Sequence, residues 1–166
     1  KSVGNGLTFP RNLVGWAELH AGVTELADEV AVRLRGHGLK CTTLQVTIRD
    51  PNFKDICRQK RLSAPTYVAR ELTETAMELI RAAWRENAPV RALTLTAQAL
   101  VEEGEAGEQL DLFAAGAAPR RDKLEKLEKA MDGIRGKFGR DAIAPASTVH
   151  RDRAEVKAEQ RLPPVD

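Results

Sequence analysis

The residues of this chain whose types and spacing suit chemistry are closely spaced cations. Residues 49–61, RDPNFKDICRQKR, hold five basic and two acidic side chains. This is the densest positive patch in residues 1–100, which carry 14 Lys and Arg against 10 Asp and Glu, a net charge of +4. Because Lys and Arg side chains bind phosphate groups and other anions, the sequence predicts a negatively charged partner for this part of the chain.

A second group of side chains is apolar and isolated. Residues 104–121, GEAGEQLDLFAAGAAPRR, place Leu110, Leu112 and Phe113 among Gly, Ala, Glu and Pro. Residues 101–113 also carry five acids and no base. Three large apolar side chains in such a run are too few to build a core, so they need an explanation outside the fold.

No arrangement of side chains has the pattern of a catalytic or metal-binding site. His20, His37 and His150 are predicted to be surface residues, and Cys41 and Cys57 lack metal-ligand spacing. There is no phosphate-loop or dinucleotide fingerprint. We predict no catalytic residue, no metal site and no cofactor in this chain, and two reduced thiols without a disulfide.

Composition also limits where the protein acts. No apolar run approaches the length of a membrane span, and the start has no signal pattern, which predicts no membrane contact and a cytoplasmic location. The first residue is Lys rather than Met, so we expect the sequence to be part of a longer protein.

Hydrophobic periodicity predicts the elements that position these residues, in the order β-α-β-β-α-β. Alternation with period two indicates four strands, and apolar residues at helical spacing indicate two helices. Pro10 is expected to end the first strand, and Thr66 to cap the second helix. A turn at 50–52 joins the middle strands into a hairpin with Arg49 opposite Phe53. The predicted strands span residues 2–9, 40–50, 53–62 and 90–100, and the helices span 17–36 and 66–86.

This order predicts an α+β fold, with two helices on one face of a four-stranded antiparallel sheet. The other face is open and has small polar residues: Ser2, Gly4, Gly6, Thr8, Thr43, Gln45, Thr47, Arg49, Thr94 and Thr96. Hydroxyl groups and glycine backbone contact nucleic-acid phosphates, whereas reading single-stranded bases requires aromatic residues, which are absent here. The face therefore suits the backbone of a duplex, bound in a salt-dependent way. An ordinary solvated sheet face is the alternative.

Three segments resemble the little-finger domain of Y-family translesion DNA polymerases of the bacterial polymerase IV type. They are KSVGNGLTFPRN at the start, NFKDICRQKRL in the middle and PVRALTLT near residue 90, and the resemblance covers residues 1 to about 113. The segment EQLDLF then resembles the pentapeptide that binds the bacterial sliding clamp, in the position where the family carries it.

The resemblance implies a domain that lies in the major groove of primer–template duplex DNA and holds its backbone. It also implies a separate palm domain that transfers nucleotides with Mg²⁺. The carboxylates of that palm have no match here, so this chain is expected to be inactive alone. The implied DNA-binding residues are Ser2, Gly4, Asn5, Gly6, Thr8, Arg49, Lys54, Arg58, Lys60, Arg61 and Arg91, and the predicted open face adds Thr47 and Thr94. The implied clamp-binding residues are Gln109, Leu110, Asp111, Leu112 and Phe113.

The chain is thereby divided into four parts. Residues 1–103 are the predicted DNA-binding domain, 104–119 a flexible linker with the clamp motif 109–113, 120–147 a helical tail element, and 148–166 a disordered tail. The tail element has an apolar stripe, formed by Leu124, Leu127, Met131, Ile134 and Phe138. Such a helix is marginal alone, so it is either a docked or transient helix or a segment that binds a partner, and the sequence leaves both open.

A different class of function also remains open at this point. The chain is predicted to be a monomer that binds duplex DNA and the sliding clamp during DNA damage bypass. The alternative is an unrelated interaction module that binds protein or RNA and has a solvated sheet face.

Overall fold

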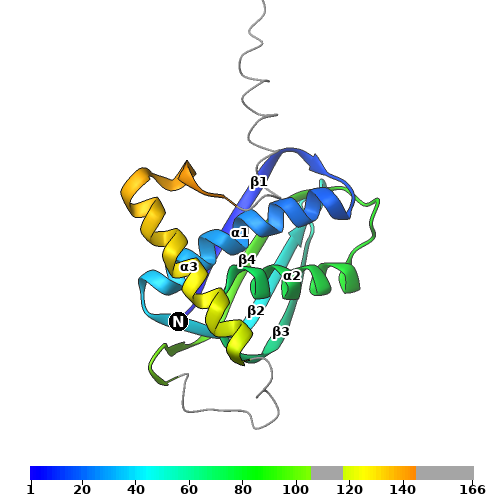
Figure 1. The fold of residues 1–166 in the computed structure, drawn as a ribbon. Coiled ribbons are helices and arrows are strands. Elements are labelled where there is room, and N and C mark those ends of the chain that lie inside the picture. Colours follow the sequence, from blue (N-terminus) through cyan, green and yellow to red (C-terminus); the bar gives the residue numbers. More distant parts are fainter. Residues whose placement is uncertain (106–117, 145–166) are drawn as a thin grey trace, which may run out of the picture.

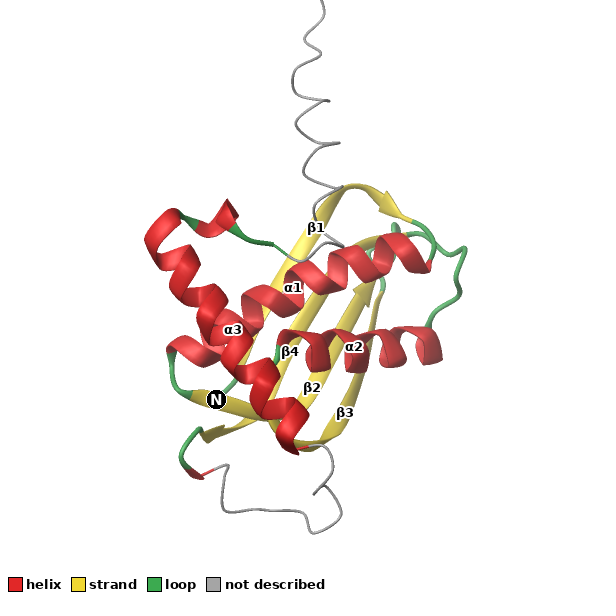
Figure 2. Ribbon diagram, viewed as in Figure 1, coloured by secondary structure: helices red, strands yellow, loops and turns green. Residues whose placement is uncertain are grey.

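A computed structural model of the chain describes residues 1–105 and 118–144, and two helices cover one face of its four-stranded antiparallel sheet (Figure 1). The strands lie in the order β1-β4-β2-β3. Figure 2 shows all the helices on the same side of the sheet. The predicted α+β fold and element order are confirmed. The elements are β1 (Val3–Leu13), α1 (Trp16–Gly36), β2 (Leu39–Arg49), β3 (Asp55–Thr66), α2 (Ala69–Ala83), β4 (Val90–Glu102), α3 (Ala118–Phe138) and a 3-10 turn, η2 (Arg140–Ala142).

Two predicted segments lie outside the described residues. The clamp motif 109–113 falls within 106–117, and the tail 148–166 follows the last described residue. Residues 145–147 of the predicted tail element also lie outside.

The core forms where the apolar sides of the central strands meet the helices. Buried residues of β2 and β4 are paired across the sheet: Leu44 with Ala97, Val46 with Leu95 and Ile48 with Leu93. A stripe of α1 packs on them with helical spacing, formed by Leu19, Val23, Leu26, Val30 and Leu34. Each buried Leu, Ile or Val contributes about 1.5–3 kcal/mol, before the entropic cost of folding. Because side chains alternate between the two faces of a strand, the residues between these buried ones point to the open face.

The first strand does not end at Pro10, as the sequence predicted, but continues to Leu13. β1 is an edge strand, and its register with β4 shifts between Thr8 and Leu13. A proline lacks the N–H that an inner strand must donate, but edge strands and bulges tolerate it. The position of β1 in the sheet, which local sequence does not reveal, explains the difference.

The predicted register of the hairpin was wrong by two residues. Arg49 is opposite Asp55 rather than Phe53. Asp50 lengthens the turn, because its Oδ1 accepts hydrogen bonds from the backbone N–H groups of Asn52 (2.8 Å) and Lys54 (2.9 Å). A shift of two residues preserves which side chains share a face, so the predicted faces remain valid.

The register keeps the two cysteines apart. Cys41 is opposite Thr66, and Cys57 is opposite Thr47. Both are free thiols, Cys41 buried and Cys57 exposed, and burial raises the pKa of Cys41 to about 12.

Helix α2 begins later than predicted, and Thr66 is not its cap. Thr66 ends β3, and its hydroxyl oxygen accepts a hydrogen bond from the N–H of Val68. The first N–H of the helix, that of Ala69, donates instead to the carboxylate of Glu128 at 2.7 Å. A carboxylate from a distant helix thus satisfies a group that a local side chain usually caps.

Helix α3 lies across α1 and the start of α2, on the side away from the sheet (Figure 1). It is held by a charged stripe with spacings of four, three, four and three residues: Arg121, Glu125, Glu128, Asp132 and Arg135. Its apolar stripe is not part of the hydrophobic core. Of the two outcomes that the sequence left open, the structure shows the docked helix. Ion pairs, rather than apolar contacts, hold it on the domain.

Among the described residues, no helix has the length and hydropathy needed to cross a bilayer.

Candidate nucleic-acid interface

The open face of the sheet is built from rows of small and polar residues. Strand pairing aligns four side-chain positions in each of three rows. The rows are Gly4-Thr96-Gln45-Gln59, Gly6-Thr94-Thr47-Cys57 and Thr8-Ala92-Arg49-Asp55, and beside the first of them Gln98, Thr43 and Arg61 are aligned. None of these residues is aromatic, so the face offers small polar groups, which suit contact with a backbone.

The glycines of β1 are required by their neighbours on β4. A Cβ atom on Gly6 would lie 2.8 Å from the hydroxyl oxygen of Thr94, and one on Gly4 would lie 3.1 Å from that of Thr96. The threonine side chains therefore lean over β1, where both glycines are exposed. This arrangement leaves the backbone of the edge strand accessible, which lets a phosphate approach it closely.

Charge on this face is concentrated at β3. The guanidinium of Arg49 donates two hydrogen bonds to the Asp55 carboxylate, at 2.7 and 2.8 Å. These bonds lower the pKa of Asp55 and raise that of Arg49. Arg61 is exposed at the end of the same face, and Lys54 is exposed in the hairpin turn. The centre of the face is thus nearly neutral, and its cations lie at the rim.

Two predicted basic residues lie on the other side of β3. Arg58 is opposite Val46 and Lys60 is opposite Leu44, so both side chains belong to the helix-facing side of the edge strand. Lys60 is ion-paired with Glu78 of α2 at 2.5 Å. The structure thus divides the basic run of 49–61 between two surfaces.

Two other predicted residues are also away from the open face, and a third precedes the paired part of β1. Asn5 is half-buried opposite Leu95 on the helix side, and Ser2 is exposed just before β1. Arg91 donates a hydrogen bond to the carbonyl of Phe9 at 3.1 Å. Of the predicted DNA-binding residues, the open face brings together Gly4, Gly6, Thr8, Thr47, Arg49, Arg61 and Thr94.

The sequence prediction omitted some members of this face. Gln59 and Cys57 lie on it, and the Gln98 amide donates a hydrogen bond to Gln45 at 2.9 Å. Alternation along β3 could have identified Cys57 and Gln59 from the sequence, because every second residue from Asp55 to Arg61 points to the open face.

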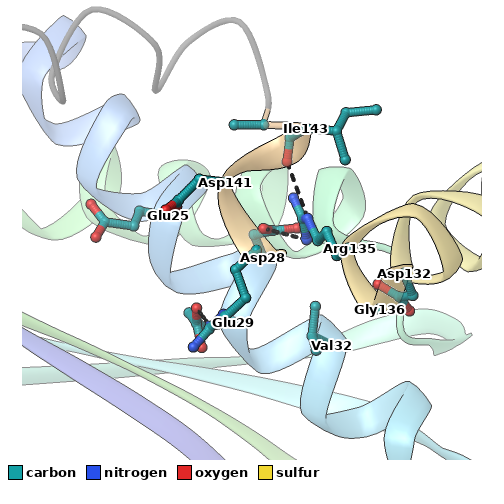
Figure 3. Close-up of a pocket in the computed structure, with 11 residues that line it drawn as sticks. Glu25, Asp28, Glu29, Val32, Asp132, Arg135, Gly136, Asp141 and Ile143 are labelled. Carbon is teal, nitrogen blue, oxygen red and sulfur yellow. Dashed lines mark hydrogen bonds and ion pairs between the residues drawn. The ribbon is translucent and has the colours of Figure 1, made fainter. Parts of the chain in front are cut away.

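The cavities described lie on the other side of the sheet. One of about 590 Å³ lies between α1, the end of α3 and η2, where Arg135 bridges Asp28 and the Ile143 carbonyl (Figure 3). A second, of about 490 Å³, lies between α1, α2 and α3. Within residues 1–105 and 118–144 no group of three or more His, Cys, Asp or Glu side chains is arranged to hold a metal ion.

Comparison with known proteins gives the class to which this fold and face belong. Residues 1–112 match the impB/mucB/samB family C-terminal domain, and the chain therefore belongs to that family.

Curated relatives are DNA polymerases IV. That of Acetivibrio thermocellus is 35% identical over 139 residues, which cover 84% of this chain and 34% of the relative. That of Oceanobacillus iheyensis is 36% identical over 143 residues, which cover 86% of this chain and 33% of the relative. The chain thus spans about a third of the length of these relatives.

Solved structures share the fold. A Y-family DNA polymerase chimera, Dbh-Dpo4(243-245)-Dbh, matches 61% of this chain and 29% of its own, with a TM-score of 0.55 and 14% identity. A complex of the beta-clamp processivity factor and the little finger domain of PolIV matches 59% of this chain and 87% of its own, with a TM-score of 0.51 and 21% identity. The resemblance to Y-family little-finger domains is confirmed.

Proposed function

We propose that this chain holds the backbone of duplex primer–template DNA on its open sheet face and links a translesion DNA polymerase to the sliding clamp. The observation that carries the proposal is the face itself, which is polar, free of aromatic residues and bordered by cations. Such a surface suits phosphates and sugars better than stacked bases. Nucleotide transfer, with its Mg²⁺, belongs in this proposal to a palm domain outside the sequence, and the whole protein acts in the cytoplasm.

Clamp binding is proposed for residues Gln109–Phe113. Burial of Leu110, Leu112 and Phe113 in a partner would gain about 1.5–3 kcal/mol each, and ordering five backbone residues would cost about 1–2 kcal/mol each. Because the two terms nearly cancel, the motif alone should bind weakly. Its connection to a DNA-binding domain raises the effective concentration of each contact for the other, and it still permits exchange on the clamp.

The salt dependence of duplex binding tests the DNA part of the proposal. Fluorescence anisotropy with a labelled duplex should give an affinity that falls steeply as salt rises, because phosphate contacts release counterions. Single-stranded RNA should compete poorly, since the face lacks stacking residues. A weak duplex affinity that does not respond to salt, or stronger binding of the RNA, would instead favour the unrelated interaction module.

Substitution of the motif tests the clamp part separately. The double variant Leu112→Ala and Phe113→Ala should abolish binding to the bacterial sliding clamp, measured by surface plasmon resonance, and leave duplex binding unchanged. The matched control, Ala114→Ser with Ala115→Ser, should bind both partners like the wild type. Loss of both activities, or of neither, counts against a separate clamp motif.

A further inference from the structure

Three of the five residues in the apolar stripe of α3 are exposed to solvent. Leu127 is 56% exposed, Ile134 39% and Phe138 76%. Among the described residues, five large hydrophobic side chains are exposed, and these three are all on α3. Scattered exposed apolar residues are ordinary, but a row of them on one helix indicates a surface that another molecule covers.

The ion pairs of α3 impose this orientation. Most residues of the apolar stripe stand one position before a residue of the charged stripe. Successive residues of a helix are rotated by about 100°, so the centres of the two stripes are about 100° apart. Arg35 binds the carboxylates of Glu128 and Asp132, and its side chain is only 5% exposed. Lys40 binds Glu125 at 2.8 Å, and Arg121 binds Glu71 at 2.9 Å. With the charged stripe directed at the domain, the apolar stripe must lie at the side of the contact.

One edge of the apolar stripe borders a groove. The cavity of about 490 Å³ is lined by Leu124, Leu127 and Met131 of α3, Ala69 and Thr73 of α2, and Thr24 of α1. The charged groups in its walls are already paired, Arg70 with Glu74 at 2.9 Å and Arg135 with Asp28 at 2.9 Å. The groove and the exposed part of the stripe share Leu127, and Ile134 and Phe138 extend the stripe along α3 beyond the groove.

The rim of this surface is basic. Arg120, Lys123, Lys126 and Lys137 of α3 are exposed, and none has an ion-pair partner within the part of the chain that the structure describes. A second copy of α3 would bring the same cations against them, which opposes self-association. The phosphate backbone of DNA would not cover Leu127, Ile134 and Phe138. A partner that satisfies both features has apolar side chains on one face and acids on the flanks.

We propose that the groove and apolar stripe of α3 bind an acidic amphipathic helix of another protein. The partner helix lies along α3 with its apolar residues in the groove, and its Asp and Glu residues face the basic rim. Recognition of an amphipathic helix in an apolar groove, with anchors three and four residues apart, is a recurring mode of peptide binding. This site lies on the helix side of the sheet, away from the open face, and its residues are distinct in sequence from the clamp motif 109–113.

The two methionines of the chain allow a direct test. Met131 lines the groove, and Met77 is 3% exposed in the core, so ¹³C-methyl methionine labelling gives one reporter and one internal control. The probe is a peptide of about 18 residues with Leu at helical spacing and Glu elsewhere. We expect it to shift the Met131 signal saturably and to leave Met77 unchanged. The same peptide with Lys in place of Glu should bind at least about tenfold more weakly.

Variants localise the binding. Leu127→Asp with Ile134→Asp should weaken peptide binding by at least about tenfold, because both side chains are exposed contacts rather than core residues. The control Val14→Asp changes another exposed hydrophobic residue, 45% exposed between β1 and α1, and should not affect binding. An unchanged Met77 signal shows that the core is intact in each variant.

Several results would overturn the proposal. One is the absence of saturable binding of the acidic peptide at concentrations up to about 1 mM. Equal binding of the Lys peptide, or wild-type binding by the Leu127→Asp, Ile134→Asp variant, would also contradict it. Sedimentation that reveals self-association, abolished by the same variant, would assign the surface to a second copy of the chain.

Discussion

At the scale of residues, the open face depends on pairs of glycine and threonine across β1 and β4. Thr94 and Thr96 occupy the space beside Gly6 and Gly4, so a side chain on either glycine would meet a hydroxyl group. A β-branched threonine has few rotamers with which to move aside. These pairs therefore keep β1 free of side chains at positions 4 and 6 of the surface proposed to contact DNA.

The substitution Gly6→Ala should lower the free energy of unfolding by about 1–3 kcal/mol, because the new Cβ would lie 2.8 Å from the Thr94 hydroxyl. Urea denaturation followed by circular dichroism measures the change. Thr94→Ala removes the obstructing atom, so the double variant should recover most of the loss in a double-mutant cycle. An additive double variant, or a Gly6→Ala protein as stable as the wild type, would show that this contact does not require glycine.

At the scale of elements, α3 is attached to the domain by charge rather than by burial of apolar surface. Glu128 is central to this attachment, since it accepts a hydrogen bond from the first N–H of α2 and pairs with Arg35. Tyr67 adds a second contact, through hydrogen bonds from its hydroxyl to Glu103 at 2.8 Å and Glu125 at 3.4 Å. Burial raises the pKa of this tyrosine, and Glu103 and Glu125 raise it further.

The pH dependence of α3 docking should follow Glu128. Burial raises the pKa of Glu128 from 4.5 to about 7, although Arg35 and the Ala69 N–H oppose the shift. The docked state holds the proton of Glu128 more tightly than the undocked state does. The stabilisation of docking that this proton gives is therefore complete below pH 4.5 and is lost as the pH rises through 7. Hydrogen exchange of α3 amides, corrected for intrinsic rates, should therefore show stronger protection at pH 5.5 than at pH 8.

Glu128→Gln is the control for this prediction, since a neutral amide has no proton to gain in this range. Its α3 protection should be nearly independent of pH between 5.5 and 8. The pKa of Glu103 is lowered by Lys129 and Tyr67, so its opposite contribution is lost only below the ordinary range of a glutamate. Equal pH dependence in the wild type and in Glu128→Gln would assign the effect to another group.

At the scale of the whole molecule, the sequence was sufficient for the fold and for the parity of the sheet. Local spacing of apolar residues determines the alternation in β2 and β4 and the stripes of α1 and α2, and this spacing can be read from the sequence alone. The extension of β1 past Pro10 depends on its place at the sheet edge, and the hairpin register depends on the Asp50 turn. The attachment of α3 depends on pairs such as Arg35 and Glu128, which are distant in sequence, so local spacing did not reveal which side of this helix faces the domain.

In the candidate site, too, local alternation predicted some residues, and the others depend on the arrangement of the strands. Sheet parity correctly identified Gly4, Gly6, Thr47 and Thr94 as neighbours on one face. The basic run of 49–61 could not be assigned to one face by composition, because alternate residues of β3 point to opposite sides. The structure therefore separates Arg61, on the proposed DNA surface, from Arg58, on the helix side.

Because Arg61 and Arg58 lie on opposite sides of the sheet, substituting each of them is the most direct test of the central claim, that the open sheet face binds duplex DNA. Arg61→Glu and Arg58→Glu make the same charge change at exposed positions of one strand, so they have the same effect on net charge but lie on opposite sides. Anisotropy with a labelled duplex should give a roughly tenfold or greater loss of affinity for Arg61→Glu, and a much smaller loss for Arg58→Glu. Equal losses, or a larger loss for Arg58→Glu, would contradict binding on the open face.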